Sequence, residues 1–224
     1  MMNEFHHATR EHSSLTAAVE KRLLIWIARR LPRAVNSDHL TALGFLSMIG
    51  AGLSYWYAAV DKALGLSLVA VFLVLNWFGD SLDGTLARVR NLQRPRYGFY
   101  LDHVLDSVGS VFLLAGLGLS GIMSMPVAMA LLIAYLLVSI ETFLATYALG
   151  KFRMSAGFFG PTELRILLLI GNAFLFYRPE VNLFGARYRL FDVGGLCGAA
   201  GMVFILIRST VRHAAALYRE ETKW

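Results

Sequence analysis

Charged residues and cysteine are both scarce in this sequence of 224 residues. Charged side chains make up 16% of the chain, against roughly a quarter in a typical soluble domain. Hydrophobic residues make up 57%, and the mean hydropathy is +0.56. Cys197 stands alone, which excludes an intrachain disulfide, and we expect it to be a small packing residue. The composition excludes an ordinary soluble globular protein and predicts an integral membrane protein with no nucleic-acid partner.

The hydrophobic residues are gathered in long runs separated by short loops. A helix that crosses a bilayer needs about 20 apolar residues, and six runs qualify: 38–60, 64–87, 99–121, 126–149, 162–178 and 191–211. Neither an internal repeat nor a second domain is evident. We therefore predict an all-α integral membrane protein with a six-helix transmembrane domain at 37–213. A cytoplasmic N-terminal segment (1–36) precedes it, and a cytoplasmic tail (214–224) follows.

The N-terminal segment has the pattern of an amphipathic helix. Its hydrophobic face comprises Leu15, Val19, Leu23, Trp26 and Ile27. Basic residues lie largely on the other faces, which suits a helix in the cytoplasmic membrane interface, against anionic headgroups. An ordinary helix packed on the bundle explains the same pattern.

Basic residues are distributed unevenly between the predicted loops. They gather in the N-terminal segment, in the loops after the second and fourth hydrophobic runs, and in the tail. By the positive-inside rule, this predicts a multi-pass protein with both termini in the cytoplasm. Arg178, Arg187 and Arg189 depart from the rule, because they fall on the predicted outer side.

Four aspartates interrupt the second and third hydrophobic runs. Asp80 and Asp83 are three residues apart, and Asp102 and Asp106 are four apart, so each pair shares a helix face. Two helices joined by a short loop are antiparallel neighbours, which lets the pairs face each other near the cytoplasmic ends. Converging carboxylates are costly in a membrane. They become tolerable around divalent cations such as Mg²⁺ or Mn²⁺, which prefer oxygen ligands.

Two glycines and an arginine accompany the aspartates. A glycine within a helix costs about 1 kcal/mol relative to alanine, so Gly84 and Gly98 need a local reason, either helix packing or close approach of a ligand. Arg88 lies one turn after Gly84, where it can meet a phosphate. Two metal ions and an arginine suit chemistry on a pyrophosphate.

The string Asp80-x2-Asp83-Gly84-x2-Ala87-Arg88-x9-Gly98-x3-Asp102-x3-Asp106 resembles the signature of the CDP-alcohol phosphotransferase (CDP-alcohol phosphatidyltransferase) family. The resemblance covers the whole chain, including the six spans and the amphipathic N-terminal helix. It departs at the start of the first span, where Ser37 replaces the proline of the family's Pro-Asn-x-x-Thr pattern. It implies a homodimeric transferase of phospholipid biosynthesis. In the implied reaction, a hydroxyl attacks the β-phosphate of a CDP-alcohol and CMP is released.

The resemblance also implies roles for the motif residues. Two divalent cations, Mg²⁺ or Mn²⁺, would be held by Asp80, Asp83, Asp102 and Asp106. Asp106 would either reach the second metal ion or act as the base toward the acceptor hydroxyl. The nucleotide and phosphate pocket would be shaped by Gly84, Ala87, Arg88 and Gly98.

The substrates follow less directly from the sequence. Six spans resemble the microbial enzymes that take CDP-diacylglycerol as donor and a small polar alcohol, such as inositol phosphate, glycerol phosphate or serine, as acceptor. A phosphorylated acceptor needs cations near the metal ions, and the candidates are Lys151, Arg153 and Arg165. The alternative is a choline/ethanolamine-type enzyme using CDP-choline or CDP-ethanolamine with a lipid acceptor.

The alternative depends on His103, because His103 and Ser107 complete an Asp-His-x-x-Asp-Ser string. His103 is then a candidate base, or else a hydrogen-bonded packing residue. Glu141, about two turns inside its span, is expected either to pair with Arg165 or to line a polar acceptor cavity, and Glu163 has no assigned role. A divalent-cation transporter is the alternative of another class, since acidic residues inside a membrane often mark an ion path.

Overall fold

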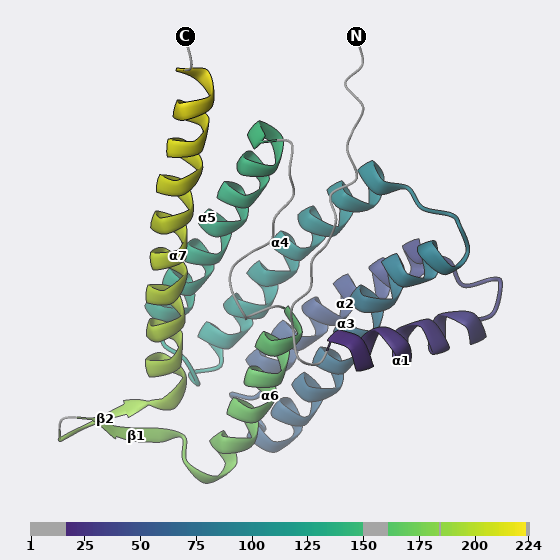
Figure 1. Ribbon diagram of the computed structural model, residues 1–224. Coiled ribbons are helices and arrows are strands. Elements are labelled where there is room, and N and C mark those ends of the chain that lie inside the picture. Colours follow the sequence, from purple (N-terminus) through teal and green to yellow (C-terminus); the bar gives the residue numbers. More distant parts are fainter. Residues whose placement is uncertain (1–16, 150–160, 184, 223–224) are drawn as a thin grey trace.

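The computed structural model describes residues 17–149, 161–183 and 185–222, and these residues form seven helices and one short hairpin (Figure 1). The helices are α1 (Ala17–Arg30), α2 (Ser37–Tyr57), α3 (Lys62–Val89), α4 (Pro95–Leu119), α5 (Met125–Leu149), α6 (Pro161–Tyr177) and α7 (Leu190–Glu221). The strands are β1 (Glu180–Leu183) and β2 (Ala186–Arg189).

Local sequence signals set where several helices begin. Asn36 caps α2, because its side-chain oxygen accepts a hydrogen bond from the amide of His39 while the His39 ring accepts from the amide of Asn36. This reciprocal arrangement satisfies amide groups that have no partner within the helix. Asp61 caps α3 with a single bond, because its side chain accepts from the amide of Leu64. Pro95 opens α4, where its missing amide hydrogen costs nothing.

Helices α2, α3 and α4 form the packed centre of the molecule. Glycines let their backbones approach closely: a Cβ at Gly116 of α4 would lie 1.9 Å from the carbonyl oxygen of Gly52 in α2. A Cβ at Gly79 of α3 would lie 2.6 Å from the Gly44 amide nitrogen. Small residues at helix contacts are the usual way to pack helices in a membrane. These contacts fix α3 and α4 beside α2, and thereby fix the residues that α3 and α4 carry.

The remaining helices are arranged around this centre. Helices α5 and α7 run side by side, and α1 and α6 both pack against α3 (Figure 1). The hairpin β1–β2 joins α6 to α7, with Glu180 paired to Arg189 and Val181 to Tyr188. This hairpin holds Arg187 and Arg189, two of the residues that depart from the positive-inside pattern.

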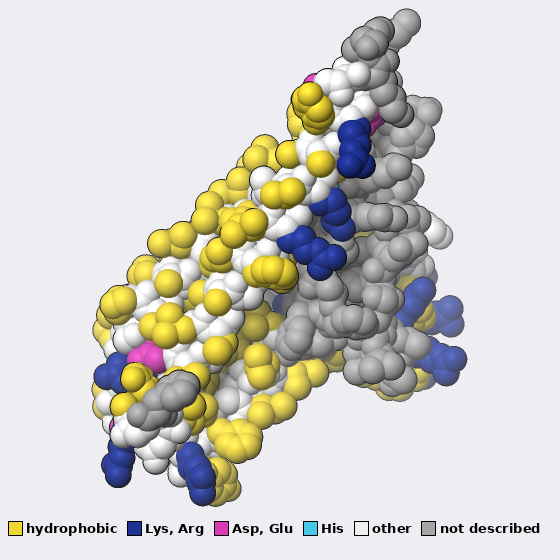
Figure 2. All heavy atoms as spheres, turned by 60° about the vertical axis from the view of Figure 1, so that its left-hand side comes forward, with side chains coloured by type: hydrophobic (Ala, Val, Ile, Leu, Met, Phe, Trp, Pro, Cys, Tyr) yellow, Lys and Arg dark blue, Asp and Glu magenta, His cyan; other side chains and the backbone are white. Residues whose placement is uncertain are grey.

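The apolar lengths of the helices support a membrane protein. Four of the described helices are long and apolar enough to cross a bilayer: α3, α4, α5 and α7. Helix α6 is apolar but shorter, and α2 does not meet the same criterion. Six helices stand where six spans were predicted, so the helical membrane class is supported while the number of crossings stays a prediction. Figure 2 shows a broad hydrophobic surface on one face, with few charged side chains within it.

One helix boundary and one helix face differ from the expected ones. Helix α7 continues to Glu221, so much of the predicted tail 214–224 is helical. Helix α1 occupies the position of the predicted amphipathic helix, and Leu24 and Ala28 are buried while Leu23 and Trp26 are exposed. Its buried face packs against a cluster that includes Leu82 and Leu86 of α3, and its place in the membrane interface stays a prediction.

Candidate active site

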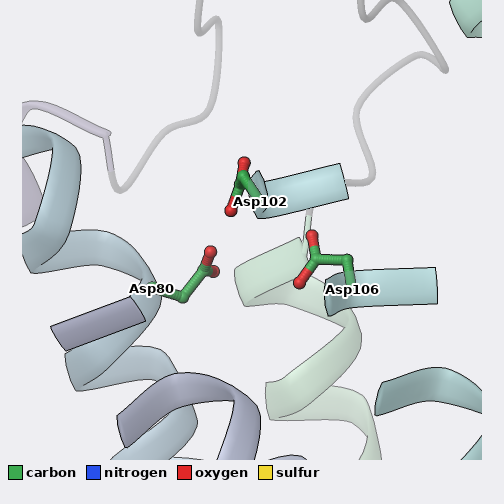
Figure 3. A group of neighbouring side chains, drawn as sticks. All are labelled: Asp80, Asp102 and Asp106. Atoms are coloured by element: carbon green, nitrogen blue, oxygen red, sulfur yellow. The ribbon is translucent and has the colours of Figure 1, made fainter. Parts of the chain in front are cut away.

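Three of the four aspartates meet between α3 and α4. Asp80 projects from α3, and Asp102 and Asp106 project from α4, with their carboxylates turned toward one another (Figure 3). Each offers one oxygen atom, and these oxygens all lie within 4.8 Å of one another. The Asp80 position is near the end of α3 and the other two are near the beginning of α4, as expected for antiparallel neighbours. The three side chains are partly buried.

Asp83 lines the same cleft, but its carboxylate has partners of its own. The hydroxyl of Thr41 donates to its Oδ2 at 2.7 Å, and the amide of Gly84 donates to its Oδ1. The hydroxyl of Ser37 donates to the Asp83 carbonyl oxygen at 2.9 Å. The start of α2 therefore holds Asp83 beside the three converging carboxylates.

Arg165 of α6 reaches into this cluster. Its guanidinium donates to Asp80 Oδ2 at 2.6 Å and, through Nε, to Asn76 Oδ1 at 2.7 Å. Asn76 in turn donates through Nδ2 to the carbonyl oxygen of Gly44 at 2.9 Å. A positive charge therefore lies against one wall of the carboxylate cleft, on a helix far along the chain.

Gly84 and Gly98 are not explained by packing. A Cβ at Gly84 would come no closer than 3.5 Å to the end of the Arg88 side chain, and a Cβ at Gly98 would meet nothing within 4 Å among the described residues. The close helix contacts instead use Gly44, Gly52, Gly79 and Gly116. The guanidinium of Arg88 donates to the hydroxyl of Thr85 at 3.0 Å. Between the two explanations of these glycines, the contacts disfavour packing. Ala87 is half-buried on α3.

His103 lines a neighbouring cleft rather than the carboxylate cleft. Its Nδ1 lies 2.6 Å from the Phe99 carbonyl oxygen and 3.9 Å from Asp102 Oδ2. Its ring lies against Phe99 and Phe143, with centroids 4.2 and 4.9 Å away. This second cleft has a volume of about 400 Å³ and an almost entirely apolar lining, to which Ser107 also contributes.

Of the two alternatives for Glu141, the pairing with Arg165 is wrong, and the lining of an acceptor cavity stays a prediction. Glu141 Oε1 lies 2.7 Å from His213 Nδ1, and Glu141 Oε2 accepts a hydrogen bond from the Ser209 hydroxyl at 3.0 Å. Both partners belong to α7, so Glu141 joins α5 to α7. Of the three acceptor-binding candidates, Arg165 is bonded to Asp80 and Asn76 of the cleft lining, and Lys151 and Arg153 lie outside the described residues. The side chain of Glu163 also lies outside them.

Two polar residues of this cleft were missed by the sequence analysis. Thr41 holds Asp83, and Asn76 holds Arg165. A signal existed for both. Thr41 is at the threonine position of the family's Pro-Asn-x-x-Thr pattern, although Ser37 replaces the proline of that pattern here. Asn76 is a polar residue one turn before Asp80 within an apolar run, and such residues inside a membrane are usually functional.

The donor set fits the divalent cations that the sequence predicted. Asp80, Asp102 and Asp106 supply oxygen atoms alone, which suit a hard cation such as Mg²⁺ or Mn²⁺ better than a soft one. The oxygens lie close enough together to bind one ion in common. Asp83 lines the same cleft and extends the acidic surface.

The fold and the site indicate a helical membrane protein with a cluster of carboxylates, able to hold a hard cation, between the adjoining ends of two neighbouring helices. The family follows from comparison with known proteins. Residues 36–211 match the sequence profile of the CDP-alcohol phosphatidyltransferase family, and the chain belongs to that family. This confirms the resemblance of the aspartate motif. It makes the chain a transferase of phospholipid biosynthesis, and it gives no support to a cation transporter.

Two known proteins are similar to this chain, one in sequence and one in fold. It is 28% identical over 140 residues to the archaetidylinositol phosphate synthase of Pyrococcus horikoshii, covering 62% of this chain and 70% of that protein. Its fold is similar to that of the phosphatidylinositol phosphate synthase of Mycobacterium tuberculosis, as seen in a crystal structure of that enzyme with CDP-DAG bound. That match has a TM-score of 0.64 at 22% identity, and it covers 86% of this chain and 94% of the other.

Proposed function

We propose that this protein transfers a phosphatidyl-type group from a CDP-linked lipid, CDP-diacylglycerol or a close analogue, to the hydroxyl of a small polyol phosphate. The observation that carries the proposal is the cleft in which three carboxylates and the Arg165 guanidinium meet. The carboxylates suit a metal-bound pyrophosphate, and the guanidinium suits an anionic acceptor. Both relatives named above are synthases of inositol phosphate lipids, which favours inositol phosphate among the acceptors.

The proposed reaction requires residues that hold the cations and residues that bind the nucleotide and its phosphates. Asp80, Asp83 and Asp102 would hold the two divalent cations, together with Asp106 where it reaches the second. When bound, these cations would neutralise the pyrophosphate and stabilise the charge that develops on the departing CMP. Among the described residues nothing lies close to Gly98, and only the end of the Arg88 side chain lies beside Gly84. The nucleotide would approach the helix backbone there, where Arg88 can meet a phosphate oxygen.

Asp106 is the proposed base. The acceptor hydroxyl oxygen attacks the β-phosphorus of the CDP-alcohol, the bond from that phosphorus to the bridging oxygen breaks, and CMP departs with this oxygen. The hydroxyl proton passes to the Asp106 carboxylate, which lines the cleft where the reaction would occur. Arg165 would bind the phosphate of the acceptor and orient its hydroxyl toward the donor.

The choline/ethanolamine-type reaction is the second candidate. It depends on His103 acting as the base, and His103 lines the apolar cleft beside Phe99 and Phe143. The Asp-His-x-x-Asp-Ser string favours it. The absence of His103 from the lining of the carboxylate cleft counts against it.

The test is an assay of purified protein in lipid vesicles with Mg²⁺ or Mn²⁺, offering each donor with each acceptor and identifying the lipid product by mass spectrometry. The donors are CDP-diacylglycerol, its archaeal ether analogue and CDP-choline. The acceptors are inositol phosphate, glycerol phosphate, serine and diacylglycerol. We expect a phosphorylated phosphodiester lipid from a CDP-linked lipid and a polyol phosphate. A product from CDP-choline and diacylglycerol alone would contradict the proposal.

A further inference from the structure

The first observation is that Arg165 rests on a carboxylate that belongs to the proposed metal site. Its terminal nitrogen is 2.6 Å from Asp80 Oδ2, and Asp80 is one of the three aspartates whose oxygens converge. The side chains are 13% exposed for Arg165 and 23% for Asp80. A charge-assisted hydrogen bond at this distance and burial is among the stronger interactions of a protein. Arg165 binds one of the two carboxylate oxygens through which Asp80 could hold a cation.

The second observation is that Arg165 is held there by a residue with no charge. Asn76 is 3% exposed and lies one turn before Asp80 on α3. Its Oδ1 accepts from Arg165 Nε, and its Nδ2 donates to the Gly44 carbonyl oxygen of α2. The amide group is therefore oriented by α2 and presents its oxygen to α6. The Arg165 side chain is long and its guanidinium is forked, so it binds Asn76 and Asp80 at the same time.

We propose that Arg165 is a built-in counter-cation that competes with the divalent cation for Asp80, and that Asn76 is the positioning residue that keeps Arg165 in competition. Arg165 offsets the repulsion among the carboxylates while no cation is bound. A cation that takes Asp80 Oδ2 as a ligand must displace the guanidinium from it. The displaced group remains in the cleft, on the end of a flexible side chain anchored at α6.

One consequence rests on the proposed function. A polyol phosphate that draws the guanidinium away from Asp80 makes this carboxylate available to the cation. Metal and acceptor phosphate then favour each other's binding, and the coupling is reciprocal because it is an equilibrium property. Arg165 would thus bind Asp80 when the acceptor is absent and the acceptor phosphate when it is present.

The test measures Mn²⁺ binding to the full-length chain in detergent or nanodiscs, using electron paramagnetic resonance to count free Mn²⁺. We expect Arg165→Gln to lower the Mn²⁺ Kd at least about tenfold, because the cation no longer has to break a charged hydrogen bond. Asn76→Ala releases Nε and should lower the Kd by a smaller factor. Arg165→Lys keeps the charge but loses the fork, and its Kd should fall between those of wild type and Arg165→Gln.

The matched control is Arg94→Gln, which removes one positive charge from a pair with Asp38, a carboxylate outside the converging group. We expect its Mn²⁺ Kd to equal that of wild type. Gel filtration and the thermal unfolding temperature identify variants that do not fold. If Arg165→Gln does not fold, Asn76→Ala and Arg165→Lys make the same comparison.

The outcomes separate the inference from the proposed function, because Mn²⁺ binding requires no turnover. A folded Arg165→Gln or Asn76→Ala variant with an unchanged or raised Mn²⁺ Kd would overturn the competition, whatever the assay of lipid products gives. Titration with inositol phosphate tests the consequence. It should lower the Mn²⁺ Kd of wild type and leave that of Arg165→Gln unchanged. An equal effect on both proteins would overturn the sharing of Arg165 with the acceptor.

Discussion

The environments of Asp106 and His103 differ in a way that bears on the base of the reaction. Asp106 lines the carboxylate cleft together with Asp80 and Asp102, whereas His103 lies against Phe99 in an apolar cleft. A group must lie within hydrogen-bond reach of the proton that it removes. The geometry therefore favours Asp106.

We expect Asp106→Asn to reduce the rate of CMP release by about 10²–10⁴-fold, which is the usual contribution of a positioned acid or base. His103→Ala should change the rate by far less. Both variants should elute as wild type on gel filtration. A large loss of turnover in His103→Ala, with Asp106→Asn retaining activity, would transfer the role of base to the histidine.

The two kinds of glycine in this chain predict opposite responses to alanine. Gly84→Ala adds a methyl group that would make only an ordinary contact, 3.5 Å from the end of the Arg88 side chain, so the protein should fold with an unchanged unfolding temperature while its KM for the CDP-linked donor rises. Gly116→Ala puts the new carbon 1.9 Å from the Gly52 carbonyl oxygen, so this variant should fold poorly. Thermal unfolding in detergent and steady-state kinetics measure the two effects. A destabilised Gly84→Ala variant with normal KM would contradict the ligand-approach explanation.

At the scale of elements, a buried hydrogen bond connects α2 to α6. The Tyr55 hydroxyl donates to Asn172 Oδ1 at 2.9 Å, and both residues are buried. Asn172 Nδ2 has no hydrogen-bond partner among the described residues. Because α6 carries Arg165, this bond also helps to set the helix that completes the cleft.

Tyr55→Phe should destabilise the protein by about 1 kcal/mol, since it leaves the Asn172 oxygen buried without a donor. The measurement is thermal unfolding of purified protein. Tyr57→Phe is the control, because Tyr57 is 43% exposed at the end of the same helix. Equal unfolding temperatures for the two variants would show that the buried bond adds no stability.

The helix pattern was largely predictable from the sequence, and the contacts between helices far apart in the chain were not. Long apolar runs located six helices to within a few residues at most ends, and spacing alone put Asp80 opposite Asp102 and Asp106. Nothing local reveals that Arg165 would find Asp80 rather than Glu141, because that choice depends on how α6 packs on α3. The hairpin β1–β2 was also missed, since each strand has only four residues and half of the eight are polar or charged, so neither strand forms a long apolar run.

At the scale of the whole molecule, the number of membrane crossings depends on α2. This helix contains Asp38 and His39 in its first turn and several small residues, and it lacks a stretch that meets the spanning criterion met by α3 and α5. It nevertheless packs along α3 and α4, both of which are long and apolar enough to cross. We expect α2 to cross with them.

Single cysteines introduced into a Cys197→Ser background test the crossing. A membrane-impermeant maleimide added to intact cells should label a cysteine at Ala59, on the outer side, and should not label one at Arg33. A cysteine at Leu92, in the loop between α3 and α4, should behave like the one at Arg33. Labelling of Arg33 and Ala59 positions from the same side would show that α2 does not cross.

The most direct test of the central claim is Mn²⁺-dependent CMP release by purified protein in lipid, comparing wild type with Asp102→Asn at matched donor and acceptor concentrations. Asp102→Asn keeps the shape of the side chain and removes one carboxylate from the converging group. We predict CMP release by wild type that requires the cation, and a loss of at least about 10²-fold in the variant, because a metal-ligating carboxylate is gone. Equal rates in the two proteins, or release that persists when the cation is removed, would contradict the account.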